Sequence, residues 1–169
     1  MIHLYCGEGK GKTTAAMGLA LRMAGRGENV VIAQFLKGED SGERYALAQL
    51  PNVRLLPVPN QIKFSFQLTS EEREKEQARY LQLLAQAEQA AESPQCALLL
   101  LDEVCAAVNT GLLPLETVLH CLDRAVCEVV LTGRDPAPAF LARADYITEM
   151  VKRRHPYDQG IAARRGVEW

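Results

Sequence analysis

Short runs of hydrophobic residues alternate along this chain with longer stretches in which hydrophobic positions recur at helical spacing. This alternation is typical of βα units packed around a mostly parallel sheet. One run, residues 97–101, is continuously apolar, as expected of a strand that is covered on both faces and lies at the centre of the sheet. The runs predict six strands, at residues 2–5, 30–35, 53–57, 97–101, 128–132 and 146–151.

The stretches between these runs predict four helices. The first, residues 13–24, is rich in alanine, leucine and methionine, and Gly25 is placed to end it. The longest begins near Thr69, whose hydroxyl can cap the helix while Glu72 bonds back in the capping-box spacing, and it ends before Pro94. Two shorter helices are expected at residues 114–124 and 137–143.

Length and composition predict a single domain over residues 1–169, because no repeat, low-complexity tract or linker divides the chain. With 48% hydrophobic residues, 24% charged residues and a net charge of −2, the chain is an ordinary globular sequence. This charge balance does not favour nucleic acid or an anionic membrane surface as a partner. No apolar run approaches the ~18 residues of a membrane span. Any recognition of phosphate therefore has to come from a local site.

The cysteines favour a reducing compartment. They number five, show no CxxC spacing, and three of them lie in or beside apolar runs, where a free thiol behaves as a small hydrophobic group. No secretory signal peptide is recognised at the N-terminus. We therefore expect a cytoplasmic protein.

The strongest local motif is a glycine-rich loop at residues 6–14, Cys-Gly-Glu-Gly-Lys-Gly-Lys-Thr-Thr, between the first predicted strand and the first predicted helix. Glycines let the backbone curl so that successive N–H groups point at phosphate oxygens, and the following helix N-terminus adds partial positive charge. Lys12 is expected to reach the phosphates and the Thr13 hydroxyl to help hold Mg²⁺. The strict P-loop pattern has glycine where this chain has Cys6. A glycine-rich turn with incidental lysines is the alternative, but the strand–loop–helix context favours phosphate binding.

Two carboxylates, Asp102 and Glu103, end the apolar run and supply the expected second half of the site. Ligands of open α/β sheets collect at the carboxyl ends of the strands, so these side chains should lie near the glycine loop and hold Mg²⁺ directly or through water. The alternative is a simple polar strand ending, and the spacing does not distinguish which carboxylate contacts the ion. Together with the glycine loop, the alternation of strands and helices predicts an α/β fold: a single P-loop (RecA-like) domain with a mostly parallel central sheet flanked by helices.

Several segments together are similar to the ATP:corrinoid adenosyltransferases. Residues 7–16 resemble the family's G-x-G-K-G-K-T-T loop, which also lacks the first P-loop glycine. Residues 34–38, Gln-Phe-Leu-Lys-Gly, resemble its Q-F-x-K-G segment, and further matches recur in the family's order over nearly the whole chain, at residues 42–44, 101–103, 132–134, 144–145 and 155–169.

The resemblance implies transfer of the 5′-deoxyadenosyl group of ATP to cobalt(I) of a corrinoid, with release of inorganic triphosphate. In this family the phosphate chain lies reversed in the loop, which leaves C5′ open to attack. Lys10, Lys12, Mg²⁺ and Arg134 would then neutralise charge on the departing triphosphate; the alternative for Arg134 is a surface arginine. The expected nucleotide-binding residues are Gly7, Glu8, Gly9, Lys10, Gly11, Lys12, Thr13, Thr14 and Arg134.

Two aromatic residues, Phe64 and Phe66, stand where the family has F-x-W, within a segment at residues 60–67 that we expect to be a loop. The resemblance implies that they pack under the corrin ring and displace the lower cobalt ligand, which eases reduction to cobalt(I). The alternative is that both rings are core residues, but their polar setting favours the site. Of the other polar residues, Gln34, Lys37 and Glu43 are expected near the site without an assigned role. His155 is expected as a turn residue before Pro156, and the alternative is a contact with nucleotide or corrinoid.

The partners implied by the resemblance are a cobalamin, cobinamide or cobyrinic acid derivative, an electron-donating reductase such as a flavoprotein, and a second copy of the chain in a homodimer. Nucleic acid and membrane partners are not expected. Two other functions remain open: an ordinary P-loop ATPase or small-molecule kinase, which would release ADP, and a non-catalytic nucleotide- or corrinoid-binding module.

Overall fold

The computed structural model of the chain, which describes residues 1–60, 63 and 67–167, contains one six-stranded sheet in which every pairing is parallel. The order of the strands across the sheet is β3-β2-β4-β5-β1-β6. The strands are β1 (Ile2–Cys6), β2 (Val30–Gln34), β3 (Val53–Leu55), β4 (Leu98–Asp102), β5 (Glu128–Thr132) and β6 (Tyr146–Glu149). The predicted mostly parallel α/β sheet is therefore confirmed, with each of its six strands.

The central strand β4 is buried along its whole length. In β4 each of the four leucines at positions 98–101 is fully buried, and the strand pairs with β2 on one side and β5 on the other. A strand covered on both faces needs apolar side chains at every position, which is why its sequence does not alternate. The prediction that this run forms the centre of the sheet is confirmed.

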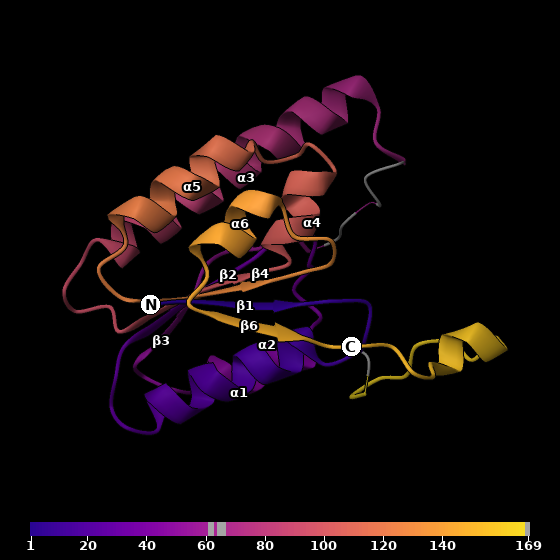
Figure 1. Cartoon of the computed structure of the whole chain (residues 1–169), viewed down its shortest axis with the longest axis horizontal. Helices are drawn as coiled ribbons and strands as arrows, with labels where there is room; N and C mark the ends of the chain where they lie inside the picture. The colour runs from indigo at the N-terminus through magenta and orange to yellow at the C-terminus, as the bar shows by residue number, and fades with distance from the viewer. Residues whose placement is uncertain (61–62, 64–66, 168–169) are drawn as a thin grey trace.

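Helices cover both faces of the sheet (Figure 1). On one face α1 (Lys12–Ala24) and α2 (Gly42–Leu47) enclose a core with the inward side chains of β2, β4 and β5. On the other face a larger core lies beneath four helices, α3 (Ser70–Ala91), α4 (Val104–Asn109), α5 (Leu115–Arg124) and α6 (Pro138–Arg143). Among the described residues, no helix is both long enough and apolar enough to cross a bilayer.

The four predicted helices are present with small shifts in their ends. Thr69 and Glu72 form the predicted capping box at the start of α3. Gly25 follows α1 but keeps a right-handed helical conformation, and the left-handed residue that reverses the chain is Gly27, with φ of 85°. The helices α2 and α4 were not predicted, because six residues give less than two turns and, unlike the equally short α6, neither has a proline in its first turn to mark its start.

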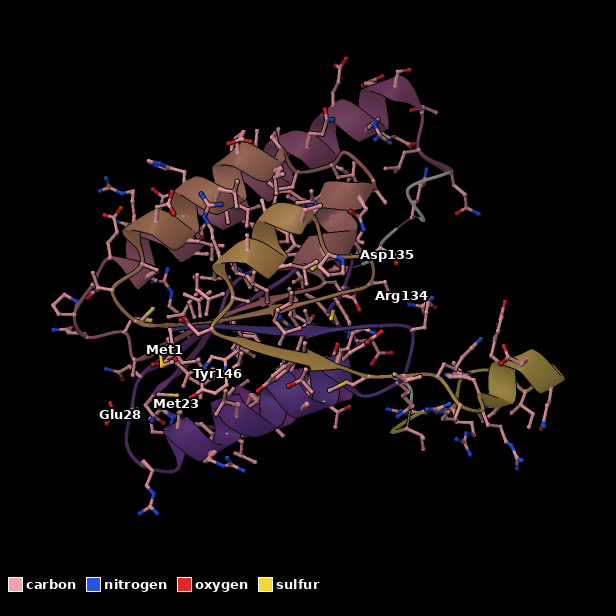
Figure 2. The ribbon with its side chains drawn as sticks, viewed as in Figure 1. Met1, Met23, Glu28, Arg134, Asp135 and Tyr146 are labelled. Atoms are coloured by element: carbon pink, nitrogen blue, oxygen red, sulfur yellow. The ribbon has the colours of Figure 1, made fainter. Side chains whose placement is uncertain are left out.

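The carboxyl ends of the strands gather at one end of the sheet. Figure 2 shows Arg134 and Asp135, which follow β5, at this end, and Met1 and Tyr146 at the opposite end. The glycine loop leaves β1 at the same end as Arg134, as do the segments after β2, β4 and β6. Chain topology therefore brings together groups that are far apart in the sequence.

Candidate active site

The glycine loop begins at Gly7, where the backbone first turns into the left-handed region, with φ of 98°. Gly11, at the N-cap of α1, has φ of 115° and needs the same freedom. Cys6 is the last residue of β1 and is not among the residues with positive φ. Because Cys6 still belongs to the strand, its backbone does not need the conformational freedom of glycine, and the loop forms without glycine at position 6.

The loop rests on the end of β6. The Gly9 N–H donates to the carbonyl oxygen of Met150 at 2.6 Å. A Cβ atom at Gly9 would lie 2.5 Å from that oxygen, and one at Gly7 would lie 2.7 Å from it. Only glycine permits so close an approach of two backbones, so these two glycines fix the loop against β6 as well as shaping it.

Lys12 lies inside the loop and is almost completely buried. Its Nζ donates to the carbonyl oxygens of Gly7 at 2.7 Å and Gly9 at 2.9 Å. Burial lowers the pKa of Lys12, while the nearby carboxylate of Glu103 acts in the opposite direction. The loop therefore surrounds a positive charge, as a site for phosphate oxygens requires.

Asp102 is fully buried at the end of β4 and is surrounded by donors. Its Oδ1 accepts hydrogen bonds from the hydroxyls of Thr13 at 2.9 Å and Thr132 at 2.7 Å. Its Oδ2 accepts from the Gln34 amide at 3.2 Å. The predicted pair Thr13 and Asp102 is thus in direct contact across 89 positions of sequence.

Glu103 turns in a different direction from Asp102. It adopts a left-handed conformation (φ 58°, ψ 21°), and its N–H donates to the Thr132 hydroxyl at 2.8 Å. No donor of the described residues hydrogen bonds to its carboxylate, which faces the cavity beside the loop. Burial, and then the charge of Asp102, raise the pKa of Glu103 above the ordinary value of 4.5. A cation bound in front of this carboxylate would stabilise its ionised form and so offset both the burial and the repulsion by Asp102.

A second cation, Lys37, approaches the site from the segment after β2. Its Nζ lies 3.5 Å from Glu43 Oε1 and 3.8 Å from Asp102 Oδ2. Burial alone would raise the pKa of Glu43, but a hydrogen bond from its own backbone N–H and the charge of Lys37 outweigh burial and lower it. Lys37 is therefore held between two carboxylates at the rim of the phosphate site.

Arg44 fixes the orientation of Gln34. It donates to the Gln34 side-chain oxygen at 2.8 Å and to the Leu56 carbonyl oxygen at 3.1 Å. A guanidinium group only donates, so the oxygen of the Gln34 amide has to face Arg44 and its NH₂ has to face Asp102. Arg44 was not predicted as part of the site.

Three buried polar residues, Gln34, Asp102 and Thr132, end β2, β4 and β5 respectively. Gln34 and Thr132 both donate to Asp102, although the sequence assigned neither of them a role. The signal that identifies them is a polar side chain at the carboxyl end of an otherwise apolar strand. It becomes specific only when the order of the strands is known.

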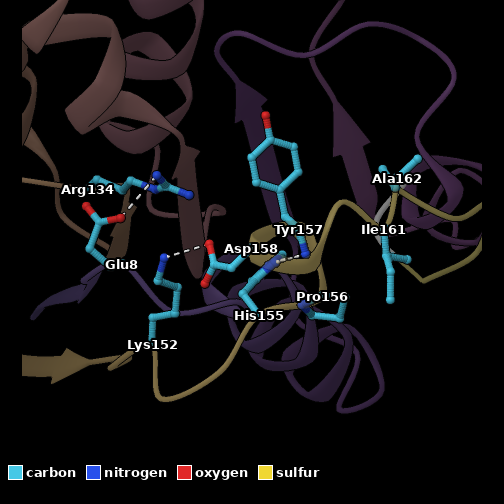
Figure 3. A pocket seen from close by; sticks show the side chains of 10 residues that line it. Glu8, Arg134, Lys152, His155, Pro156, Tyr157, Asp158, Ile161 and Ala162 are labelled. Atoms are coloured by element: carbon cyan, nitrogen blue, oxygen red, sulfur yellow. Dashed lines mark hydrogen bonds and ion pairs between the residues drawn. The ribbon is translucent and has the colours of Figure 1, made fainter.

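Arg134 lies beside the loop and pairs with Glu8, at 3.1 Å between Nη1 and Oε2 (Figure 3). Both side chains are more than half exposed, so this ion pair contributes little to stability and can exchange partners with an anionic ligand. Gly133 (φ 148°) brings β5 against α4, where a Cβ atom would lie 2.5 Å from that of Cys105. This contact positions Arg134 at the loop.

A cavity of about 930 Å³ lies over the loop. Of the predicted nucleotide-binding residues, all except Gly7 line it, and of the predicted metal-binding residues Thr13 and Glu103 line it while Asp102 lies behind them. The predicted aromatic residues Phe64 and Phe66 lie outside the described residues. The other residues that line the cavity are Met17, Lys37, Gly42, Glu43, His155, Gly166 and Val167.

The donors in this cavity suit a hard cation that also binds phosphate. A hydroxyl from Thr13 and a carboxylate from Glu103 are oxygen ligands, which Mg²⁺ prefers together with water and phosphate oxygens. Within the described part of the chain, no group of three His, Cys, Asp or Glu side chains forms a complete metal site. The residues therefore fit Mg²⁺ that arrives with a polyphosphate, rather than an ion held by the protein alone.

Comparisons with known proteins find relatives along the whole chain. The family model described as ATP:corrinoid adenosyltransferase BtuR/CobO/CobP matches residues 1–169. A corrinoid adenosyltransferase of Pseudomonas aeruginosa is 32% identical over 172 residues, covering 100% of this chain and 83% of the relative. The corrinoid adenosyltransferases of Salmonella typhimurium (CobA) and Escherichia coli are each 31% identical over 177 residues, covering 100% of this chain and 85% of each relative.

Proposed function

The chain belongs to the ATP:corrinoid adenosyltransferase family, and we propose that it transfers the 5′-deoxyadenosyl group of ATP to cobalt(I) of a corrinoid, releasing inorganic triphosphate in adenosylcobalamin synthesis or salvage. The observation that carries the proposal is the meeting of three features in one cavity: the glycine loop, the buried Lys12 and the cavity-facing Glu103. Together they suit a polyphosphate with its Mg²⁺ ion.

The reaction asks the protein to stabilise a leaving group. As the cobalt–carbon bond forms, the C5′–O5′ bond breaks and its electron pair leaves with the triphosphate. The loop N–H groups, Lys10 and Lys12 would hold the charge that develops on the triphosphate, and Arg134 would add to them by exchanging Glu8 for a phosphate oxygen. The attacking metal is itself the nucleophile, so the protein need not remove a proton.

The two carboxylates have different roles in this proposal. Asp102 is fully buried and already accepts three hydrogen bonds, so it acts by orienting Thr13. Glu103 faces the cavity and would contact Mg²⁺ directly or through water. Bound Mg²⁺ would neutralise part of the charge on the phosphate oxygens. Thr13 would contribute its hydroxyl to the same ion, as its contact with Asp102 allows.

The acceptor side of the reaction is proposed from the family resemblance. Phe64 and Phe66 would pack against the corrin ring and keep a lower ligand off the cobalt. The acceptor would be a cobalamin, a cobinamide or a cobyrinic acid derivative, and the electrons would come from a reductase such as a flavoprotein. We also propose that the protein is cytoplasmic and forms a homodimer.

The test is anaerobic incubation with ATP, Mg²⁺ and chemically reduced cob(I)alamin, followed by absorbance spectra before and after exposure to light. We expect a photolabile cobalt–carbon product and release of triphosphate in equal amount. Release of ADP from ATP alone, without a corrinoid product, would instead identify an ATPase or kinase. Binding of both substrates without turnover would identify a non-catalytic module.

A further inference from the structure

The segment after β2 leaves the sheet at Leu36 in an unusual backbone conformation. Phe35 still follows β4, because its N–H donates to the Asp102 carbonyl oxygen at 2.9 Å. Leu36 then adopts a φ of 52°, in the left-handed region that residues other than glycine rarely occupy. A leucine side chain disfavours this conformation, so contacts from elsewhere in the fold have to hold it.

The hydroxyl of Tyr80, on α3, supplies such a contact. The Leu36 N–H donates to the Tyr80 hydroxyl oxygen at 2.8 Å, across 44 positions of the sequence. The Tyr80 side chain is only 1% exposed, and its ring packs edge-on against that of Phe35 with 5.3 Å between the ring centroids. Burial raises the pKa of Tyr80 above the ordinary value of 10, so the hydroxyl stays neutral at pH 7. A closely packed ring therefore presents one uncharged oxygen to the turn at Leu36.

This anchor is local to the turn. Between Phe35 and Glu39, the Leu36 N–H is the one backbone group that hydrogen bonds to another described residue. The next backbone contact along the chain is made by the Glu39 N–H, which donates to the Pro59 carbonyl oxygen at 3.2 Å. The path of the chain from the end of β2 to Glu39 thus depends on the bond to Tyr80.

Lys37 follows the turn directly and lines the cavity over the glycine loop. Its Nζ lies between the carboxylates of Glu43 and Asp102, and about a quarter of its side chain is exposed. An ammonium group has three N–H donors, so Lys37 can keep a carboxylate partner and still donate to a phosphate oxygen. Because Leu36 and Lys37 are adjacent, the conformation of Leu36 sets where the Lys37 side chain begins.

We propose that Tyr80 is a positioning residue that holds Lys37 at the cavity, where Lys37 binds an oxygen of the triphosphate of ATP. The inference rests on the proposed function for its ligand. Tyr80 does not line the cavity, so it acts through the backbone of Leu36. Lys10 and Lys12 belong to the glycine loop, and Lys37 adds a positive charge from a second element of the fold.

A double-mutant cycle between Tyr80→Phe and Lys37→Met distinguishes positioning from general structural support. Phenylalanine lacks only the hydroxyl, and methionine lacks the charge but keeps a long unbranched side chain. Calorimetry without corrinoid would measure the Kd of ATP with Mg²⁺ for the full chain and each variant. We expect the Kd to rise about tenfold for Lys37→Met and about fivefold for Tyr80→Phe. The double variant should remain at about tenfold, because no lysine is left for Tyr80 to position.

A Kd raised about fiftyfold in the double variant would overturn the inference, since the effects of independent sites multiply. A Kd within about 1.5-fold of the unmodified chain in either single variant would overturn it as well. Tyr146→Phe is the matched control, because Tyr146 is half exposed and lies at the opposite end of the sheet (Figure 2). Its Kd should stay within about 1.5-fold. Circular dichroism well below the Tm of each variant checks that all of them are folded.

This binding assay does not depend on turnover, so the inference and the proposed function can fail separately. A chain that shows the expected cycle but makes no adenosyl product from ATP and cob(I)alamin would refute only the proposed function. A chain that makes this product, but in which the two substitutions act independently on the Kd of ATP, would refute only the role of Tyr80.

Discussion

Replacing Thr132 with valine tests whether the buried hydroxyl at the end of β5 holds the two carboxylates in place. Valine has nearly the same shape as threonine but neither donates nor accepts a hydrogen bond. The substitution removes the hydrogen bond to Asp102 Oδ1, at 2.7 Å, and the acceptor of the Glu103 N–H, at 2.8 Å. Thr132 is fully buried, so water cannot take its place without rearrangement.

The expected loss of stability follows from these two contacts. A hydrogen bond to a charged group contributes about 1.5–3 kcal/mol, and a buried N–H left unpaired costs about 1–3 kcal/mol. The extra buried methyl of valine returns roughly 1 kcal/mol. The net expectation is a decrease of about 3 kcal/mol in the free energy of unfolding, or about 6–12 °C in Tm for a domain of this size.

Urea and thermal unfolding followed by circular dichroism would measure this difference. The matched control is Thr148→Val on β6, where the threonine is exposed and has no hydrogen-bond partner for its hydroxyl among the described residues. The control should change the free energy of unfolding by less than about 0.5 kcal/mol. If Thr132→Val loses no more than the control, the hydroxyl does not hold the carboxylates and the reasoning is refuted.

Four further substitutions test other parts of the site. Lys12→Ala should weaken ATP binding by about 100-fold, equivalent to about 3 kcal/mol, and abolish ATP use; unimpaired binding by calorimetry would exclude the phosphate role of the loop. Glu103→Gln should weaken Mg²⁺-dependent ATP binding yet make the unliganded protein more stable at pH 7. The pKa of Glu103 is raised in the folded state, so its contribution to stability is present below pH 4.5 and is lost as the pH rises through the higher folded value. Urea unfolding at pH 4 and pH 7 checks this, and equal or lower stability of the variant at pH 7 would contradict it. Phe64→Ala and Phe66→Ala should each slow adenosylation from cobalt(II) plus reductant more than from preformed cobalt(I), and equal slowing in both assays would argue against a role in displacing the lower ligand.

The chain order of the elements could be predicted from the sequence because each strand and long helix carries its own local pattern. The continuous leucines of β4 predicted its central place, and the capping residues of α3 predicted its start. The short helices α2 and α4 escaped prediction because their six residues show no clear period and no proline marks their start, as one does in α6. The predicted strands at residues 53–57 and 146–151 extend two residues beyond β3 and β6, because hydrophobic residues follow the last residue of each strand.

By itself the sequence determined the fold class and the place of the glycine loop that carries Lys12 and Thr13, because these depend on residues close together in the chain. It also identified Asp102 and Glu103 as a pair, but because the two residues are adjacent in the chain, their spacing from the loop cannot separate their roles. Only the tertiary structure decided that Asp102 is enclosed by donors while Glu103 faces the cavity.

Tertiary structure alone also brought the segment after β6 to the loop and Thr132 to Asp102. These contacts depend on the order of strands across the sheet, where β5 lies between β1 and β4, and β6 lies beside β1. That order is set by how all the helices and strands pack together. No local segment encodes it, which is why the sequence pattern predicted the elements but not which polar side chains meet.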